Sequence, residues 1–141
     1  MDADALIAAL GLQPHPEGGH YRETFRAPPA AGETRGATTA IFFLLRRGER
    51  SHWHRVDAVE IWHWHAGAPL ALEIAEPGTP RRTLTLGIDF TAGQTPQGVV
   101  PTHAWQAART LGDWTLVGCT VSPAFEFSGF ELAPPGWEPG G

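Results

Sequence analysis

The pattern of hydrophobic and polar positions predicts a chain built almost entirely of short β-strands. Segments rich in Val, Ile, Leu, Thr and aromatic residues recur along the sequence, and turn-forming Gly or Pro separates them. We expect strands at 20–25, 37–45, 51–56, 59–65, 69–75, 82–88, 97–101, 104–108, 114–121 and 125–133. About ten short strands with regular turns are typical of an all-β sandwich, jelly roll or barrel.

The first residues have a helical pattern instead. Leu6, Ile7 and Leu10 are spaced to lie on one side of a helix over about 2–10, and the acidic residues at its start favour the positive end of the helix dipole. Gly11 can end this short helix.

The length of 141 residues is that of one domain, so we interpret 1–141 as a single unit with a loose Pro- and Gly-rich tail at about 134–141. Composition then narrows the chemistry. Lysine is absent, which excludes lysine Schiff-base catalysis, and the net charge is −5 with no basic run longer than two residues. We therefore expect no nucleic-acid partner and no membrane partner.

The compartment is predicted from two features. The single Cys119 cannot form an intramolecular disulfide, and the first residues carry acids where a signal peptide needs basic side chains. No apolar run has the length of a membrane-spanning helix. These features predict a reduced, cytoplasmic protein.

Four of the seven histidines form two His-Trp-His triplets, at 52–54 and 63–65. Residues i and i+2 of a strand share a face, so each triplet places two imidazoles together. In the second triplet the carboxylate of Glu60 alternates with Trp62 and Trp64 on one face. If Glu60 points inward, the histidines of the second triplet point outward, and only the first triplet faces the barrel.

The segment 48–67, GERSHWHRVDAVEIWHWHAG, resembles the first motif of the cupin superfamily, G-x5-H-x-H-x3or4-E-x6-G. His54 and Glu60 stand at motif positions, whereas Val56 replaces the second histidine. The second motif is matched more loosely: Pro101 fits, and Gln106 replaces its histidine.

More narrowly, the sequence is similar to a family of small single-domain cupins of unknown function, Cupin-5. The similarity extends from HPEGGHYRETFR to LVGCTVSPAFEFSGFELA. The resemblance implies a double-stranded β-helix, which is a jelly-roll barrel, with a pocket in the barrel mouth and a homodimeric state. It implies no reaction.

In ordinary cupins these motif positions bind Fe, Mn, Ni or Zn. Because two ligand positions are altered, we expect His52 to supply a lost ligand, which gives one divalent ion among His52, His54, Glu60 and Gln106. The residues leave open whether a metal is bound. His54 and Glu60 are the predicted catalytic residues, as ligands or as acid and base.

The predicted ligand is a small polar or ring-containing molecule, sugar-like or nucleotide-like. The residues expected to contact it are Tyr21, Glu23, Arg55, Trp62, Trp64 and Gln106. Three functions fit: a cupin enzyme with a single divalent metal, a metal-free sugar or sugar-nucleotide isomerase or epimerase, and a non-catalytic small-molecule binding module or sensor.

Overall fold

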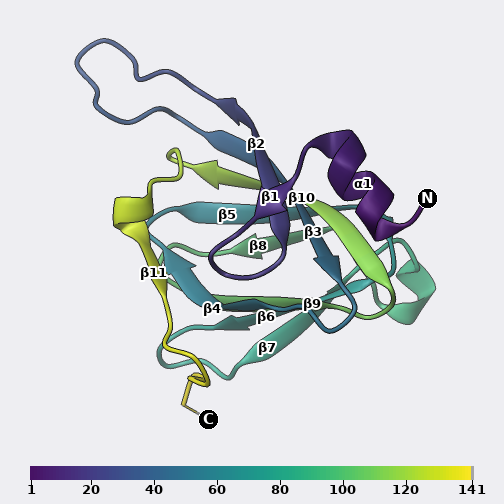
Figure 1. The fold of residues 1–141 in the computed structure, drawn as a ribbon. Helices are drawn as coiled ribbons and strands as arrows, with labels where there is room; N and C mark the ends of the chain where they lie inside the picture. Colours follow the sequence, from purple (N-terminus) through teal and green to yellow (C-terminus); the bar gives the residue numbers. More distant parts are fainter. Residues whose placement is uncertain (141) are drawn as a thin grey trace.

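Eleven strands, one α-helix and two 3₁₀ turns make up the fold of residues 1–140, which a computed structural model describes (Figure 1). The elements are α1 (Ala3–Leu10), β1 (Gln13–Pro14), β2 (His20–Arg26), β3 (Thr39–Arg46), β4 (Ser51–Val56), β5 (Val59–Gly67), β6 (Leu70–Ala75), β7 (Arg82–Leu86), β8 (Gln97–Val100), β9 (Trp105–Thr110), β10 (Trp114–Ser122) and β11 (Phe130–Leu132). The 3₁₀ turns are Phe90–Ala92 and Phe127–Gly129.

Two antiparallel sheets face each other. The six-stranded sheet has the order β1-β2-β3-β10-β5-β8, and the five-stranded sheet has the order β11-β4-β9-β6-β7. Successive strands β4 and β5 lie in different sheets, so the chain crosses from one layer to the other there (Figure 1). The predicted all-β jelly roll with a short N-terminal helix is confirmed.

The main core fills one end of the space between the sheets. Phe43 of β3, Trp62 of β5, Leu72 of β6 and Leu86 of β7 belong to one buried cluster. Along β5 the buried side chains alternate with partly exposed ones, as the sequence predicts. Burying such side chains contributes roughly 1.5–3 kcal/mol each to stability, and this packing holds the two sheets together.

Helix α1 begins and ends at the predicted residues. The Asp2 side chain accepts a hydrogen bond from the Ala5 N–H, and Gly11 takes the left-handed conformation that closes the helix. This eight-residue helix buries none of its residues completely. Within the described part of the chain, no helix is long and apolar enough to cross a membrane.

The C-terminal segment differs from the predicted strand at 125–133. Only Phe130–Leu132 forms a strand, because the chain first makes the 3₁₀ turn Phe127–Gly129, with Gly129 so close to Asp57 that any side chain there would clash with the carboxylate. The following tail is partly packed, since Trp137 lies 4.5 Å from Trp105 between ring centres. Its last residue, 141, lies outside the described residues.

Candidate functional site

A small cavity lies between the sheets, beside the main core. Its walls come from the loop after β1, from strands β2, β3, β4, β5 and β10, and from the C-terminal segment. The lining residues are His15, Glu17, Tyr21, Thr39, Ile41, His54, Val56, Glu60, Cys119, Val121, Phe125 and Phe130. The free volume is about 30 Å³, room for about two water molecules.

Strand β4 delivers one histidine of the first triplet to this cavity. Ser51 pairs with Ala108 and His54 pairs with Gln106, so β4 has one residue more than β9 between these pairs and forms a β-bulge. The bulge breaks the alternation of side chains. Ser51 and His54 therefore both point inward, Ser51 to the Glu17 carboxylate and His54 into the pocket, whereas the His52 ring lies 2.9 Å from the Pro134 carbonyl oxygen.

Glu17 is placed by a tight turn. Gly18 and Gly19 have φ values of +107° and +77°, and a Cβ at Gly18 would clash with the Arg50 backbone. This close approach needs glycine. The His52 N–H donates to the Glu17 carbonyl oxygen at 2.8 Å, and the Ser51 hydroxyl donates to the Glu17 carboxylate at 2.9 Å. The turn thus inserts a carboxylate into the barrel beside β4.

Glu17 and His54 form a close buried acid–base pair. His54 Nδ1 lies 2.8 Å from the His52 carbonyl oxygen, so Nδ1 carries a hydrogen. His54 Nε2 lies 3.1 Å from Glu17 Oε2. Burial raises the pKa of Glu17 and lowers the pKa of His54. Both shifts favour the uncharged form of each group, in which the proton lies on the Glu17 carboxyl group.

Glu60 is the second acid–base group of the cavity. Burial raises its pKa to about 7, although the nearby His54 and a hydrogen bond from Gln106 act in the opposite direction. Gln106 Nε2 donates to Glu60 Oε1 at 2.9 Å, and the Trp62 indole N–H donates to Gln106 Oε1 at 2.8 Å. Because an indole can only donate, this chain fixes the Gln106 amide with its NH₂ group toward Glu60.

The structure places three of the predicted site residues, Tyr21, His54 and Glu60, in the cavity wall. Gln106 is buried behind Glu60 and is absent from the wall. Burial of the Glu60 carboxylate is thus confirmed, together with its neighbours on the inner face of β5.

The other predicted contact residues lie elsewhere. Trp62 packs in the main core, and the Trp64 indole donates to the Ala68 carbonyl oxygen at 3.0 Å, so the expected tryptophan wall is replaced by phenylalanines. Glu23 pairs with Arg26 on the surface. Arg55 pairs with Glu131 and stacks on Trp105 outside the barrel.

The second histidine triplet faces outward, as the sequence predicts. Gln97 Nε2 donates to His63 Nδ1 at 3.2 Å, and His63 Nε2 lies 3.2 Å from the Thr120 hydroxyl. His65 is exposed next to Gly118. These imidazoles are separated from the cavity by the sheet itself.

The pocket does not fit the four-ligand metal centre expected from the sequence. His52 lies outside the cavity because of the bulge, and Gln106 has its oxygen committed to the Trp62 N–H. Among residues 1–140, no group of three or more His, Cys, Asp or Glu side chains is arranged to hold a metal ion. His54 is instead paired with Glu17, whose Oε2 lies 3.1 Å from its Nε2.

Sequence reasoning missed Glu17, His15, Phe125 and Phe130 as lining residues. The Glu17 N–H donates to His15 Nδ1 at 3.1 Å, so the motif HPEGG contributes both residues from one turn. A carboxylate directly before two glycines was the available signal, because two adjacent glycines permit a close backbone approach.

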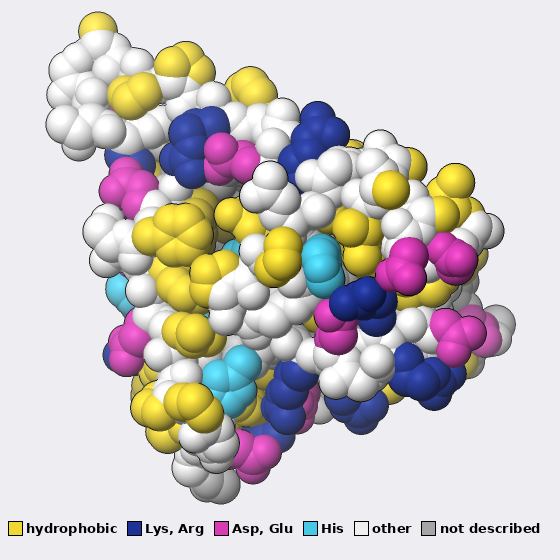
Figure 2. Space-filling model, in the orientation of Figure 1, with side chains coloured by type: hydrophobic (Ala, Val, Ile, Leu, Met, Phe, Trp, Pro, Cys, Tyr) yellow, Lys and Arg dark blue, Asp and Glu magenta, His cyan; other side chains and the backbone are white. Residues whose placement is uncertain are grey.

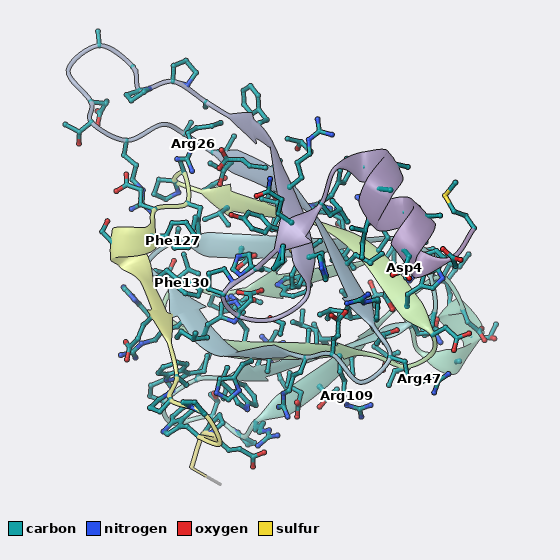
Figure 3. All side chains as sticks on the ribbon, in the orientation of Figure 1. Asp4, Arg26, Arg47, Arg109, Phe127 and Phe130 are labelled. Atoms are coloured by element: carbon teal, nitrogen blue, oxygen red, sulfur yellow. The ribbon has the colours of Figure 1, made fainter. Side chains whose placement is uncertain are left out.

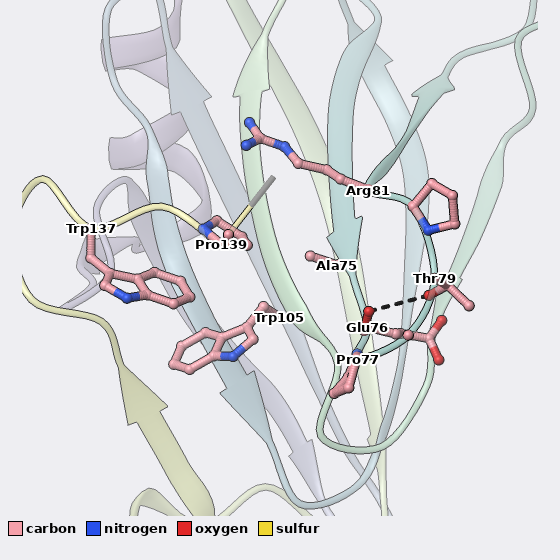
Figure 4. A pocket seen from close by; sticks show the side chains of 11 residues that line it. Ala75, Glu76, Pro77, Thr79, Arg81, Trp105, Trp137 and Pro139 are labelled. Atoms are coloured by element: carbon pink, nitrogen blue, oxygen red, sulfur yellow. Dashed lines mark hydrogen bonds between the residues drawn. The ribbon is translucent and has the colours of Figure 1, made fainter.

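A wider, open hollow of about 640 Å³ lies outside the barrel (Figure 4). Trp105, Trp137, Glu76 and Arg81 line it, and the tail forms one side. Its described lining includes no histidine and no buried carboxylate. The buried histidine and carboxylates described above line the inner cavity instead.

A jelly-roll barrel with its polar residues gathered in an interior pocket defines the cupin class of proteins. Within that class the chain belongs to the Cupin_5 family, described as Cupin superfamily (DUF985), which matches residues 4–133. The family resemblance seen in the sequence is confirmed.

Two solved structures share both sequence and fold with this chain. Protein SO0799 from Shewanella oneidensis is 42% identical, with a TM-score of 0.89 over 94% of this chain and 85% of that chain. A hypothetical protein from Leishmania major is 32% identical, with a TM-score of 0.85 over 94% of this chain and 88% of that chain. Oxalate decarboxylase from Bacillus subtilis is 10% identical, with a TM-score of 0.64 over 85% of this chain and 29% of that chain, and shares the fold alone. A comparison with curated proteins found no match.

Proposed function

We propose that this cupin is an enzyme that moves a proton on a small carbonyl compound, using its own side chains and no metal ion, and that the barrel pocket admits this compound when the partly exposed Phe125 and Phe130 rings move aside. The observation that carries the proposal is that two buried acid–base centres, the Glu17–His54 pair and Glu60, face one cavity. A purely structural core seldom contains two buried carboxylates without a positively charged partner.

Each centre is suited to one half of a proton shift. With a pKa of about 7, Glu60 is partly ionised at neutral pH and remains basic enough to take a proton from the carbon next to a carbonyl. The Glu17–His54 pair holds a proton at the cavity wall and gives it to the carbonyl oxygen, forming an enediol. Return of the Glu60 proton to the neighbouring carbon, and of the hydroxyl proton to the pair, completes an isomerisation.

Solvent exchange tests this function. The protein is treated with a chelator and incubated in D₂O with hydroxyacetone, glyceraldehyde or dihydroxyacetone, and deuterium at the carbon next to the carbonyl is followed by NMR. We expect protein-dependent exchange that survives the chelator. Glu60→Gln should reduce its rate by about 10²- to 10⁴-fold, the usual contribution of general acid–base catalysis.

Glu73→Gln is the matched control, because Glu73 is a partly buried carboxylate outside the cavity, in ion pairs with Arg50 and Arg81. It should leave exchange unchanged. Loss of exchange after chelation, recovered with a divalent ion, would support the metal-dependent alternative. Binding without exchange in any compound would support the non-catalytic sensor.

A further inference from the structure

The cavity has acidic groups and histidines but no arginine. The chain has ten basic residues, all arginine, and eight of them form ion pairs with Asp or Glu. Figure 2 shows basic and acidic side chains next to each other on the visible face. No arginine lines the cavity. Among residues 1–140, the basic side chains that line it are His15 and His54.

Burial keeps both imidazoles from supplying positive charge. It lowers the pKa of His15 and of His54, so both are neutral near pH 7. A phosphate or carboxylate in the cavity would meet Glu17 and Glu60 without a countercharge. Burying an unpaired ion costs several kcal/mol, which disfavours any anionic ligand.

Apart from Tyr21, Thr39 and Cys119, the rest of the wall is apolar. Val56, Val121, Ile41 and the ring of Phe130 surround the carboxyl groups. Phe125 and Phe130 lie 5.7 Å apart between ring centres, and Phe127 contacts both. Figure 3 shows Phe127 and Phe130 beside β11 at the edge of the barrel, where Figure 2 shows hydrophobic side chains gathered. Because the free volume is about 30 Å³, a hydroxyketone enters only when these partly exposed rings move aside, and larger compounds are disfavoured.

We infer that the substrate is an uncharged short-chain hydroxyketone or hydroxyaldehyde, and that the pocket rejects phosphorylated, carboxylated and nucleotide-linked compounds. This inference rests on the proposed function and narrows it. Of the ligands expected from the sequence, it retains uncharged sugar-like compounds and excludes nucleotide-like ones. The carbonyl end contacts the Glu17–His54 pair, and the carbon chain lies against Phe130 and Val56.

Three compounds of nearly equal shape test the charge preference: hydroxyacetone is neutral, pyruvate is an anion and aminoacetone is a cation. Binding is measured at pH 6 by ligand-observed NMR, and exchange in D₂O is measured in the same samples. Below pH 7 Glu60 is mostly protonated, so an ion of either sign lacks a countercharge. We expect hydroxyacetone to bind at least about tenfold more tightly than either ion.

Equal or tighter binding of pyruvate or aminoacetone overturns the inference, even if exchange occurs. Hydroxyacetone binding that exceeds both ions supports it, even if no exchange is seen and the proposed function fails. The variant Glu60→Gln further separates the charge preference from the proposed catalysis. It should retain hydroxyacetone binding within about threefold and lose exchange.

A second variant is designed to gain a binding site for an anion. Phe130 lies on the short edge strand β11 and is partly buried against Val56 and Val121, so Phe130→Arg places a guanidinium at the cavity wall at a cost in packing. Pyruvate should then bind at least about tenfold more tightly than to the wild type, since arginine supplies the missing charge. Thermal unfolding confirms that the variant is folded, and unchanged pyruvate affinity in the folded variant contradicts the charge argument.

Discussion

Asp57 and Glu60 are three residues apart in the sequence and differ in burial, in hydrogen-bond partners and in pKa. Asp57 lies in the turn between β4 and β5, where Arg35 donates to both carboxylate oxygens at 3.2 and 2.8 Å. These hydrogen bonds lower the pKa of Asp57. Glu60 lies inside the barrel, where burial raises its pKa to about 7.

The comparison shows that two carboxylates beside one short turn are suited to different roles, Asp57 to stability and Glu60 to proton transfer. At the rim of the barrel, Arg35 keeps the Asp57 carboxylate charged and ties it to the loop between β2 and β3. In the pocket, the neighbours of Glu60 are the neutral Gln106 amide and the Cys119 thiol, whose own pKa burial raises. A carboxylate without arginine is able to exchange its proton near neutral pH.

The largest effect is expected in the pH dependence of exchange. Because Glu60 acts as the base, protonation below pH 7 removes it, and kcat/KM should fall about tenfold per pH unit to about 100-fold below its plateau at pH 5. Asp57 stays ionised over this range because its pKa is lowered. Exchange measured in D₂O from pH 5 to 9 gives the profile, and a rate that is flat across this range contradicts the role of Glu60.

The stability of the folded protein should change with pH in the direction opposite to the exchange rate. The folded-state pKa of Glu60 is raised, so the folded protein binds more protons than the unfolded chain between about pH 4.5 and 7. Wild-type stability therefore decreases as pH rises, by about 2 kcal/mol between pH 5 and 7 from this group. Urea unfolding should show that Glu60→Gln loses this decrease, whereas the control variant Glu73→Gln keeps it.

The contrast between these carboxylates was partly predictable from the sequence. Period-two alternation along β5 placed Glu60 and Trp62 inward and the two histidines of the second triplet outward, because a strand with one buried face enforces its register. The strand boundaries followed from Gly and Pro in the same way. These features depend on local pattern alone.

The rest of the site depends on contacts between distant segments. His52 was expected beside His54, but the bulge in β4 arises from its pairing with β9, which the sequence of β4 does not contain. Glu17 reaches His54 only because its turn packs against Arg50. The alternating segment before β11 predicted a strand, yet its phenylalanines cluster with one another instead.

A smaller effect is expected from the residue that holds Glu60. Gln106→Leu leaves the Trp62 N–H and Glu60 Oε1 without partners in a buried site, which should cost about 1–2 kcal/mol of unfolding free energy. It also removes a hydrogen bond to the carboxylate, so the exchange profile should move to higher pH. Gln97→Leu, at an exposed glutamine on β8, is the control. A lower stability with an unmoved pH profile contradicts the positioning role of Gln106.

The smallest effect is expected at the other carboxylate of the comparison. Asp57→Asn removes a charge close in sequence to Glu60 but leaves the pocket wall intact, since Asp57 is absent from the lining. Its ion pair with Arg35 is partly exposed to solvent, so unfolding in urea should show a loss below about 1 kcal/mol. Exchange should stay within twofold of the wild type at every pH. A large fall in exchange would mean that any acidic side chain near the barrel mouth matters, and the distinction between the rim and the pocket would then lose its basis.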